Sequence, residues 1–501
     1  MVWSSRRVAL ASTKAYLAID LGASSGKIIV GAYDGHRISV QEVHRFPNGA
    51  VSEAGSLRWP IRRLFREIQT GIGKALQLYG NQLVSIGVDT WGVDYGLLDG
   101  YDELIEHPYH YRDMRTMGIM DRVVDSLGEE DLYKQASVQF MEMNTLFQLI
   151  AAKEQTPQIY RKAKSLLFIP DLINFWLTGS KLTDKTLAST SQFYDPRLHT
   201  WAYSLLEKLE LSEELLQDLY DPGYQIGALR SSIIKDYDTS NISVILTGTH
   251  DTASAVAAVP ANTADWAFLS SGTWSVLGVE ASEPIINLEA LRMRLGNETG
   301  VCGTVRPLKN VSGLWLIQET KRIWSEKGMR FDYENLNELA IRAAPFSSLI
   351  NPDDTVFLKP GDIPSRIRGY CHRTNQHQPS SEGQVIRTIL EGLALRYRSV
   401  LDDIDHAVGR ECKKIHIVGG GAQNELLNQF TANATNRPVV AGPFEATAIG
   451  NILVQLIAHG EISSLQEARE LSYSSFDLVE FEPQDTSVWS EAYEQFCTSV
   501  I

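Results

Sequence analysis

Apolar residues along the first part of the chain are spaced in a way that predicts three short strands. Residues 16–22 form an apolar run that ends in Asp-Leu-Gly, and residues 27–33 form a second run that stops before Asp34-Gly35. Residues 37–46 then alternate in polarity, and Asp-Gly between two such runs is a signal for a β-hairpin. We therefore expect three strands joined by tight turns. A Rossmann domain begins strand–helix–strand, so this opening disfavours that fold.

The next segments complete a recognisable order of elements. Residues 60–79 start with a proline and carry apolar side chains on one helical face, which predicts an amphipathic helix. Residues 83–89 form another apolar run, typical of a buried strand, that ends in an aspartate. Three strands, a helix and a strand are the order of the nucleotide-binding half of actin-like proteins.

The second half of the chain echoes the first. Residues 19–26 (IDLGASSG) and 267–274 (AFLSSGTW) both read as a strand ending in Ser-Ser-Gly, displaced by 246 positions. Residues 414–421 form an apolar strand that breaks into three glycines, and residues 425–435 follow as a helix. Two copies of one phosphate-binding turn predict two related lobes that face a shared cleft.

Composition and charge narrow the function. A chain of 501 residues, 44% hydrophobic and 21% charged, has the balance of a folded protein with at least two cores. Its 46 basic and 61 acidic residues give a formal charge of −15. This charge argues against nucleic acid or an anionic membrane as the main partner. A phosphate ligand remains possible, because it needs only local backbone N–H groups, one cation and a metal.

Cysteines and terminal residues bear on the compartment. The four cysteines are widely spaced and form no CxxC pair, so a zinc cluster or disulfide framework is not expected, and a reducing, cytoplasmic location fits best. No run approaches about 18 uncharged apolar residues, so no membrane span is expected. Residues 1–14 are basic, but their apolar stretch is too short for a secretory signal peptide. A plain extension before the first strand is favoured over a targeting peptide.

Residues 22–27 (GASSGK) are a candidate phosphate-binding turn. Small residues, two hydroxyls and Lys27 lie between two predicted strands, where backbone N–H groups can meet a phosphate. Only three residues separate the glycines, so the segment is not a Walker A loop. Asp20 precedes the turn, and one acid with several waters suffices for Mg²⁺. An ordinary glycine-rich hairpin is the structural alternative.

Two further segments carry polar groups suited to a sugar and a proton acceptor. Residues 86–94 (IGVDTWGVD) place polar groups and Trp91 at the end of a strand, although Asp89-Thr90 could be a helix cap and Trp91 a core residue. Residues 248–258 begin a helix after His250-Asp251-Thr252. Asp251 could be a helix N-cap, or a carboxylate that accepts a proton from a hydroxyl. These two interpretations are compatible.

Two segments of the second half are candidates for nucleotide contacts. Residues 269–274 (LSSGTW) form the partner turn, where Thr273 could bond a phosphate oxygen, unless the segment is a plain hairpin. Residues 418–424 (VGGGAQN) differ from a dinucleotide fingerprint, because the sixth position is Asn424 and no ribose-binding acid follows. The three glycines could instead let the backbone approach an adenine or its ribose. No other residues typical of a metal site lie near His107 and His110 in the sequence, so both are expected to be surface or core residues.

Taken in order, these segments resemble the FGGY family of carbohydrate kinases. Within the family they are most similar to the branch that phosphorylates L-rhamnulose. The resemblance covers residues 16 to 456. It is carried by DLGASSGK, EVHRFPNG, SIGVDTWGVDYGLLD, YRDMRT, THDTASAV, LSSGTWSVLG, LKNVSGLWLIQ, HIVGGGAQNELLNQ and GPFEATAIGN. It implies an α/β fold of two actin-like (ribonuclease H-like) lobes with an ATP and sugar cleft between them. We expect an N-terminal lobe over residues 15–259 and a C-terminal ATP-binding lobe over residues 260–490.

The resemblance also implies roles for individual residues. Asp251 would be the catalytic base, and Asp20 would help to hold Mg²⁺. The sugar contacts would be Gly92, His250, Asp251, Thr252 and Asn310. The ATP contacts would be Ala23, Ser24, Ser25, Gly26, Lys27, Thr273, Gln318 and Gly420. Lys27 stands where many relatives carry arginine, so its contact with phosphate would be a point charge and not a fork.

The reaction that the resemblance implies is transfer of the ATP γ-phosphate to the C1 hydroxyl of L-rhamnulose. Another ketose, such as L-fuculose or L-xylulose, is the nearest alternative, because the motifs fix phosphoryl transfer better than sugar stereochemistry. A non-catalytic actin-like protein that binds ATP or a sugar is the second. Expected partners are therefore a small-molecule ketose and ATP, with no nucleic acid and no membrane.

Overall fold

The computed structural model describes residues 13–235 and 237–500. The chain folds into two compact units, each built from segments that are separate in the sequence. Unit 1 contains residues up to 260 together with 297–305 and 447–475. Unit 2 contains residues 261–296, 306–446 and those from 476 onward. The expectation about an extension at residues 1–14 falls almost wholly on residues 1–12, which lie outside the described residues.

Unit 1 is organised on a six-stranded mixed sheet. Its strands, in spatial order, are β13 (Gln225–Ala228), β14 (Ser243–Ile245), β6 (Leu83–Thr90), β1 (Lys14–Leu21), β2 (Ser25–Tyr33) and β3 (Ile38–Pro47). β1, β2 and β3 pair antiparallel in sequence, whereas β6 lies parallel to both β1 and β14. The three predicted opening strands, their tight turns and the fourth strand are therefore confirmed.

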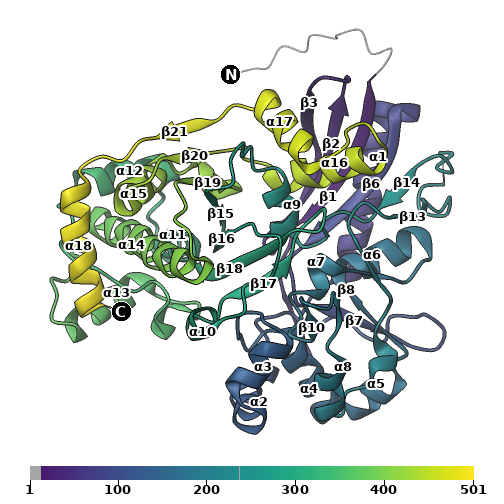
Figure 1. Cartoon of the computed structure of the whole chain (residues 1–501), viewed down its shortest axis with the longest axis horizontal. Helices are drawn as coiled ribbons and strands as arrows, with labels where there is room; N and C mark the ends of the chain where they lie inside the picture. Colours follow the sequence, from purple (N-terminus) through teal and green to yellow (C-terminus); the bar gives the residue numbers. More distant parts are fainter. Residues whose placement is uncertain (1–12, 236, 501) are drawn as a thin grey trace. The chain divides into compact units, whose positions relative to one another are not determined.

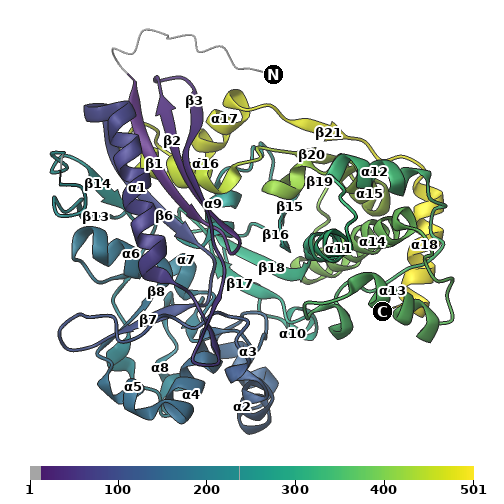
Figure 2. The same ribbon diagram turned by 180° about the vertical axis from the view of Figure 1, so that it is seen from behind.

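Two helices cover opposite faces of this sheet, as the two views in Figures 1 and 2 show. Helix α1 (Ile61–Tyr79) lies on one face, where a Cβ on its Gly71 would come within 2.4 Å of Ile28. Helix α16 (Ala446–Ala458) lies on the other, where a Cβ on Gly31 would come within 2.7 Å of Ile452. Ile28 and Gly31 are three positions apart on β2 and so point to opposite faces. Glycine lets both helices approach closely.

The rest of unit 1 consists of short helices and two-stranded ribbons that extend from this sheet. The paired short strands are β4 (Val51–Glu53) with β5 (Ser56–Arg58), β7 (Tyr95–Leu98) with β8 (Ser165–Phe168), β9 (Thr183–Asp184) with β12 (Leu219–Tyr220), and β10 (Tyr194–Asp195) with β11 (Thr200–Trp201). The helices are α2 (Ile119–Leu127), α3 (Glu129–Gln135), α4 (Thr145–Gln155), α5 (Pro157–Lys162), α6 (Ile169–Thr178), α7 (Lys185–Ala188), α8 (Tyr203–Lys208), α9 (Asp251–Ala257) and α17 (Leu465–Ser475).

Unit 2 carries a second sheet. Its strands, in spatial order, are β18 (Val305–Ser312), β16 (Trp274–Val279), β15 (Trp266–Ser271), β19 (Lys414–Val418), β20 (Val439–Ala441) and β21 (Val479–Phe481). β15, β16 and β18 pair antiparallel, whereas β15, β19 and β20 run parallel. The short strand β17 (Gly296–Thr299) has its last three residues in unit 1.

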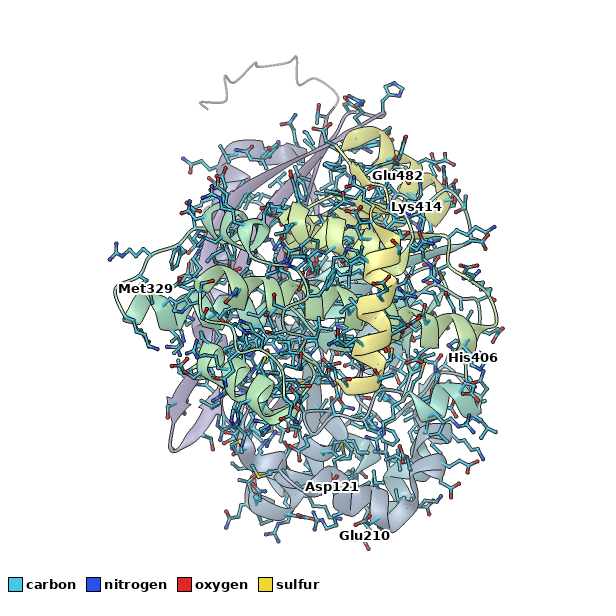
Figure 3. All side chains as sticks on the ribbon, turned by 90° about the vertical axis from the view of Figure 1, so that its left-hand side faces the viewer. Asp121, Glu210, Met329, His406, Lys414 and Glu482 are labelled. Atoms are coloured by element: carbon cyan, nitrogen blue, oxygen red, sulfur yellow. The ribbon has the colours of Figure 1, made fainter. Side chains whose placement is uncertain are left out.

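The helices of unit 2 are α10 (Leu288–Arg292), α11 (Trp315–Glu326), α12 (Tyr333–Arg342), α13 (Ile363–Arg373), α14 (Glu382–Val408), α15 (Glu425–Thr435) and α18 (Thr486–Ser499). The long helix α14 begins at a capping box between Ser381 and Gln384 and ends at Gly409, which has a φ of 73°. Figure 3 shows α18 passing over the other helices of this unit, where Trp489 packs edge-on against Phe346 at 4.8 Å between ring centroids.

The echo between the two halves is confirmed by the topology of the two sheets. Each has three antiparallel strands followed by two parallel ones, and each has a tight turn between its first and second strands. The two Ser-Ser-Gly sequences do not occupy equivalent positions in the two sheets, however. Ser25-Gly26 begins the second strand of unit 1, whereas Ser270-Ser271 ends the first strand of unit 2. The equivalent turn glycines are Gly22 and Gly272, which donate to the carbonyls of Ser25 and Trp274.

No helix among residues 13–235 and 237–500 is long and apolar enough to cross a membrane. All four cysteines are free thiols, two of them buried and two exposed. The same residues contain no group of three or more histidine, cysteine and acidic side chains that could hold a metal ion by themselves.

Candidate functional site

The first phosphate-binding turn lies between β1 and β2, and Asp20 and Lys27 flank it. The two residues are directly opposite each other in the antiparallel register, with 4.0 Å between Lys27 Nζ and Asp20 Oδ2. Ala23 and Ser24 form the tip of the turn, whereas Ser25, Gly26 and Lys27 already belong to β2. Lys27 therefore acts from the strand, and the backbone N–H groups at the tip are the groups that can meet a phosphate.

Asn48 braces this turn from the end of β3. Its Nδ2 donates to the carbonyl of Gly22 at 2.8 Å, and its backbone N–H donates to the carbonyl of Ser24 at 3.0 Å. These two bonds fix both sides of the tip. The segment EVHRFPNG that carries the resemblance contains Asn48, but the sequence predicted no role for this residue, because Pro-Asn-Gly after a strand is typical of an ordinary turn.

Asp89 is the end of a buried polar chain that crosses unit 1. Asn451 Nδ2 donates to Asp89 Oδ2 at 2.6 Å, and Gln455 on the same helix bonds Asn451, Ser85 and the carbonyl of Leu17. The other oxygen, Oδ1, has no hydrogen-bond partner among the described residues. Burial, followed by the charge of Asp20, raises the pKa of Asp89 well above its ordinary value. The strand continues to Thr90 and no helix follows, so the suggestion that Asp89-Thr90 is a helix cap is wrong.

The end of β6 lies beside the loop that precedes Asp251. Thr90 N–H donates to the carbonyl of Thr249 at 2.8 Å and forms an isolated parallel bridge with His250. The buried carboxylate of Asp184 holds this loop from behind, accepting from the N–H of Thr249 at 3.0 Å and from its hydroxyl at 2.7 Å. Two separate sequence motifs are thereby brought together at one edge of the sheet.

Asp251 is the first residue of helix α9 and not its N-cap. His250 holds the cap position, and no side chain makes a capping hydrogen bond there. The Asp251 carboxylate accepts from the Thr252 hydroxyl at 3.1 Å, and its side chain is 31% exposed. The interpretation of Asp251 as a helix cap is therefore wrong. The carboxylate is reachable by a ligand and stands at the positive end of a helix.

Gly92 lies in a strained turn between β6 and β7. A Cβ at this position would come within 3.2 Å of the Thr190 side chain, so only glycine fits without displacing it. Val93 has a φ of 66°, an uncommon conformation for a β-branched residue. Thr190 accepts from the Val93 N–H at 3.1 Å and Thr145 donates to its carbonyl at 2.7 Å, which holds this backbone in place.

Asp94 anchors the aromatic residues next to this turn. Its fully buried carboxylate accepts hydrogen bonds from the indoles of Trp59 and Trp91, the backbone of Tyr111 and the amide of Gln148, at 2.5 to 3.1 Å. Burial nevertheless raises the pKa of Asp94 to about 6. Because the carboxylate of Asp94 is buried and held by four hydrogen bonds, we interpret Asp94 as a structural residue that fixes these aromatic side chains.

Trp91 is a core residue. It is 6% exposed and packs against Trp59 at 3.9 Å between ring centroids, with the two rings tilted by 31°. His110 stacks on the other side of Trp59 at 4.2 Å and is buried, as expected for a core histidine. His107 instead pairs with Glu53 at 2.9 Å on the surface.

In unit 2, two of the residues expected to contact ATP meet directly. Thr273, in the second turn, donates to the side-chain oxygen of Gln318 at 3.3 Å. The turn is held by the start of α11, because the N–H groups of Leu314 and Trp315 donate to the carbonyls of Gly272 and Thr273. The segment is therefore more than a plain hairpin.

The three glycines after β19 play different parts. Gly419 has a φ of 83°, and a Cβ on Gly421 would lie 2.0 Å from Ser271 Oγ, so both positions need glycine for the backbone to pack against the second turn. Gly420 is exposed, and no described atom lies within 4 Å of the place its Cβ would occupy. Among the three, Gly420 is the one that a ligand can approach.

A cavity of about 500 Å³ adjoins Gln318 on helices α11 and α12, which is the size of a small-molecule site. It is lined by Gln318, Lys321, Arg322, Ser325, Glu326 and Tyr333. Lys321 Nζ lies 4.1 Å from the centre of the Tyr333 ring. Sequence reasoning found only Gln318, because Lys321 and Tyr333 have no motif and meet only through helix packing.

The predicted sugar contacts divide between the two units. Gly92, His250, Asp251 and Thr252 lie in unit 1, where the structure brings the ends of β6 and the start of α9 together. Asn310 lies in unit 2 on β18, opposite Val276 of β16. The predicted ATP contacts divide likewise, with residues 23–27 in unit 1 and Thr273, Gln318 and Gly420 in unit 2.

The carboxylates beside the first turn fit the chemistry of Mg²⁺, which binds one or two carboxylates and several waters. Asp20 is 8% exposed, and it faces Asp89 across the parallel register of β1 and β6. The orphaned Oδ1 of Asp89 is the kind of buried oxygen that a cation or its water would satisfy.

Comparison with solved structures places the fold. The chain is similar to gluconate kinase from Lactobacillus acidophilus, with a TM-score of 0.79, 16% identity and 97% of each chain covered. It is also similar to Plasmodium falciparum glycerol kinase with ADP, with a TM-score of 0.76, 15% identity, and 98% of this chain and 99% of that chain covered. The expected α/β fold of two actin-like, ribonuclease H-like lobes is confirmed.

Comparison of sequences is more specific. A protein named rhamnulokinase from Bacteroides thetaiotaomicron is 40% identical over 481 residues, covering 96% of this chain and 98% of its own. Another of the same name from Halalkalibacterium halodurans is 41% identical over 469 residues, covering 94% and 99%. Models of the N-terminal and C-terminal domains of the FGGY carbohydrate kinases match residues 15–258 and 267–459. The chain therefore belongs to the FGGY family of carbohydrate kinases.

Proposed function

We propose that this protein transfers the γ-phosphate of ATP to the C1 hydroxyl of L-rhamnulose, giving L-rhamnulose 1-phosphate and ADP. The observation that carries the proposal is the Asp251 carboxylate. It stands partly exposed at the start of α9, does not cap the helix, and lies beside the end of β6 that carries Gly92. A family of carbohydrate kinases needs such a group to accept the proton of the attacking hydroxyl.

The two units supply different parts of the proposed reaction. In unit 1, Asp251 takes the C1 hydroxyl proton while that oxygen attacks the γ-phosphorus in line with the departing ADP oxygen. Lys27 and the backbone N–H groups of Ala23 and Ser24 at the tip of the turn bind phosphate oxygens as negative charge redistributes. In unit 2, Thr273, Gln318 and Gly420 bind the nucleotide, and Gln318 also lines the adjoining cavity.

Asp20, with Asp89 beside it, would hold Mg²⁺. When bound, the ion neutralises charge on the ATP phosphates. Asp20 also pairs with Lys27, whose Nζ lies 4.0 Å from Asp20 Oδ2.

L-rhamnulose is proposed as the acceptor because the relatives named rhamnulokinase match this chain almost end to end. L-fuculose and L-xylulose remain the competing substrates. In unit 1, Trp91 precedes Gly92 in the chain and packs with Trp59. An apolar ring next to a sugar-binding residue suits the methyl end of a 6-deoxy ketose better than a hydroxyl.

The test is ADP release with magnesium-ATP and a panel of ketoses, for the wild-type chain and Asp251→Asn. We expect the highest kcat/KM with L-rhamnulose and a loss of about 10²- to 10⁴-fold in kcat for the variant. Asp121→Asn, an exposed acid on α2, is the matched control and should leave kcat unchanged. If another ketose gives the highest kcat/KM, the substrate is wrong and the kinase stands. If no ketose stimulates ADP release, a binding protein replaces the kinase.

We also propose that the enzyme works in the cytoplasm, with ATP and the ketose as its partners. Four free thiols are compatible with a reducing compartment. Nucleic acid and anionic membranes are not proposed as partners because of the formal charge of −15.

A further inference from the structure

Glu298 is a buried acid that belongs to no sequence motif described above. It lies on β17, in the segment 297–305 that joins unit 1 although it is distant in sequence from residues 13–260. The residue is only 4% exposed. A carboxylate loses most of its hydration at such a position, so it is retained only where a polar or charged partner compensates for the loss.

The backbone on both sides of Glu298 is anchored within unit 1. The N–H of Asn297 donates to the carbonyl of Ser137 at 2.7 Å, and the N–H of Thr299 donates to the hydroxyl of Ser189 at 2.9 Å. The segment also packs against the loop before α9, since a Cβ on Gly248 would lie 3.1 Å from Val301. The carboxylate of Glu298 is therefore held in a fixed position relative to His250.

Glu298 pairs with the imidazole of His250. Oε2 of Glu298 lies 3.0 Å from Nδ1 of His250, while the other ring nitrogen, Nε2, lies 3.5 Å from Oδ1 of Asp251. The histidine side chain is 12% exposed. The three side chains form an ordered series that ends at the proposed catalytic base.

We propose that Glu298 is a positioning residue of the kinase, which keeps a proton on Nδ1 of His250 and turns Nε2 toward Asp251 and the ketose. The identity of the ketose in this inference rests on the proposed function, whereas the geometry of the histidine does not. A carboxylate oxygen can only accept, so the Nδ1–H must donate to it. In this tautomer Nε2 carries a lone pair and can accept a hydrogen bond from a sugar hydroxyl beside Asp251.

Other polar groups near His250 act on its main chain. Asp251 faces Nε2, and Glu298 faces Nδ1. Asp184 lies behind the loop, where it accepts from the backbone and hydroxyl of Thr249, and the hydroxyl of Thr186 accepts from the backbone N–H of His250. These bonds fix the main chain, and Glu298 fixes the ring. A histidine held at both its backbone and its ring presents one nitrogen in one direction, which discriminates among hydroxyl arrangements.

Two substitutions separate the parts of the proposal. Glu298→Ala removes the acceptor, whereas Glu298→Gln keeps an acceptor oxygen of the same reach and loses only the charge. We expect Glu298→Ala to lower kcat/KM for the ketose about 10- to 100-fold, in line with the loss of an orienting carboxylate behind a histidine, with KM for ATP unchanged. Glu298→Gln should recover most of that loss and stay within about fivefold of wild type.

The decisive readout is the protonation of the ring, measured on the full chain labelled with ¹⁵N-histidine and without substrate. The His250 signals are identified by their loss in His250→Gln. We expect a protonated Nδ1 in the wild type, and a shift toward the Nε2–H tautomer in Glu298→Ala. A merely structural glutamate would not change this tautomer. If Nδ1 is unprotonated in the wild type, or if Glu298→Ala leaves the tautomer unchanged, the proposal is overturned.

The tautomer also separates this proposal from the proposed function. Should no ketose be phosphorylated, a protonated Nδ1 that depends on Glu298 would still support the positioning role. Should L-rhamnulose be phosphorylated while the tautomer is independent of Glu298, only the present inference fails. If Glu298→Ala does not fold, Glu298→Gln and the wild-type spectrum still decide the matter.

Discussion

Gly420 and Gly421 are adjacent residues for which the structure predicts opposite consequences of one added methyl group. Gly420 is exposed, and its Cβ would meet no described atom within 4 Å. Gly421 is buried, and its Cβ would lie 2.0 Å from Ser271 Oγ and 2.6 Å from Ser271 Cβ. The pair Gly420→Ala and Gly421→Ala therefore separates a ligand-facing glycine from a packing glycine.

The magnitudes follow from these distances. A Cβ at 2.0 Å must move its neighbour by more than 1 Å to reach ordinary contact, and overpacking of this kind costs about 1–3 kcal/mol or more. At Gly420 no such cost arises, and replacing glycine by alanine reduces the entropy of the unfolded chain, so stability should be unchanged or rise by up to about 1 kcal/mol. If the nucleotide approaches the Gly420 backbone, the methyl group weakens its binding by about 1.4 kcal/mol, or tenfold.

Thermal unfolding and steady-state kinetics test this reasoning together. We expect Gly421→Ala to unfold at a lower temperature than wild type, and Gly420→Ala to unfold at the same or a slightly higher one. KM for ATP should rise about tenfold in Gly420→Ala, while KM for the ketose stays constant. An unchanged KM for ATP in Gly420→Ala would refute the assignment of Gly420 to the nucleotide. A stable Gly421→Ala would refute the packing argument.

Three further predictions concern unit 1. In the native state the pKa of Asp94 is raised to about 6 from 3.8, so the native state binds this proton more tightly than the unfolded chain does. The resulting stabilisation is fully present below pH 3.8, and it is lost as the pH rises through 6. On lowering the pH from about 7 to about 5, the unfolding free energy of wild type should therefore gain about 1 kcal/mol relative to Asp94→Asn in denaturant titrations, and a constant difference would contradict the raised pKa. Lys27→Met should lower kcat/KM for ATP about a hundredfold, with Lys27→Arg restoring most of it, and equal effects of both changes would exclude a charge contact. Asn48→Ala removes the 2.8 Å bond to the Gly22 carbonyl and should raise KM for ATP about fivefold, whereas an unaltered KM would show that the turn holds itself.

Much of the fold was predictable, because it follows from local patterns. The predicted strands and the helix at residues 60–79 correspond closely to β1, β2, β3, β6 and α1. These elements carry continuous apolar runs or a single apolar face, and such patterns do not depend on distant residues. The repetition of the strand order in unit 2 was also predicted, although the two Ser-Ser-Gly sequences that suggested it lie at different positions of the two sheets.

The site was less predictable, because several of its residues meet only through the tertiary fold. Glu298 lies 48 positions from His250, and Asn48 lies 26 positions from Gly22. No local pattern distinguishes a buried orienting carboxylate from an ordinary strand residue. The sequence offered two compatible interpretations of Asp251, and the position of His250 at the N-cap excludes one of them, the helix cap. The role of Asp251 as proton acceptor stays a prediction.

Helix α16 has a consequence for the synthesis of the protein. It covers one face of the unit 1 sheet through Ile452, and Gln455 bonds the carbonyl of Leu17 across 438 residues of sequence. The first strands to leave the ribosome therefore keep an uncovered apolar face until nearly the whole chain has been translated. At about 5–20 residues per second, this interval lasts some tens of seconds. Chains truncated before residue 446 should bind chaperones or aggregate. Folding of the N-terminal strands, which are translated first, therefore depends on a helix that is translated near the end.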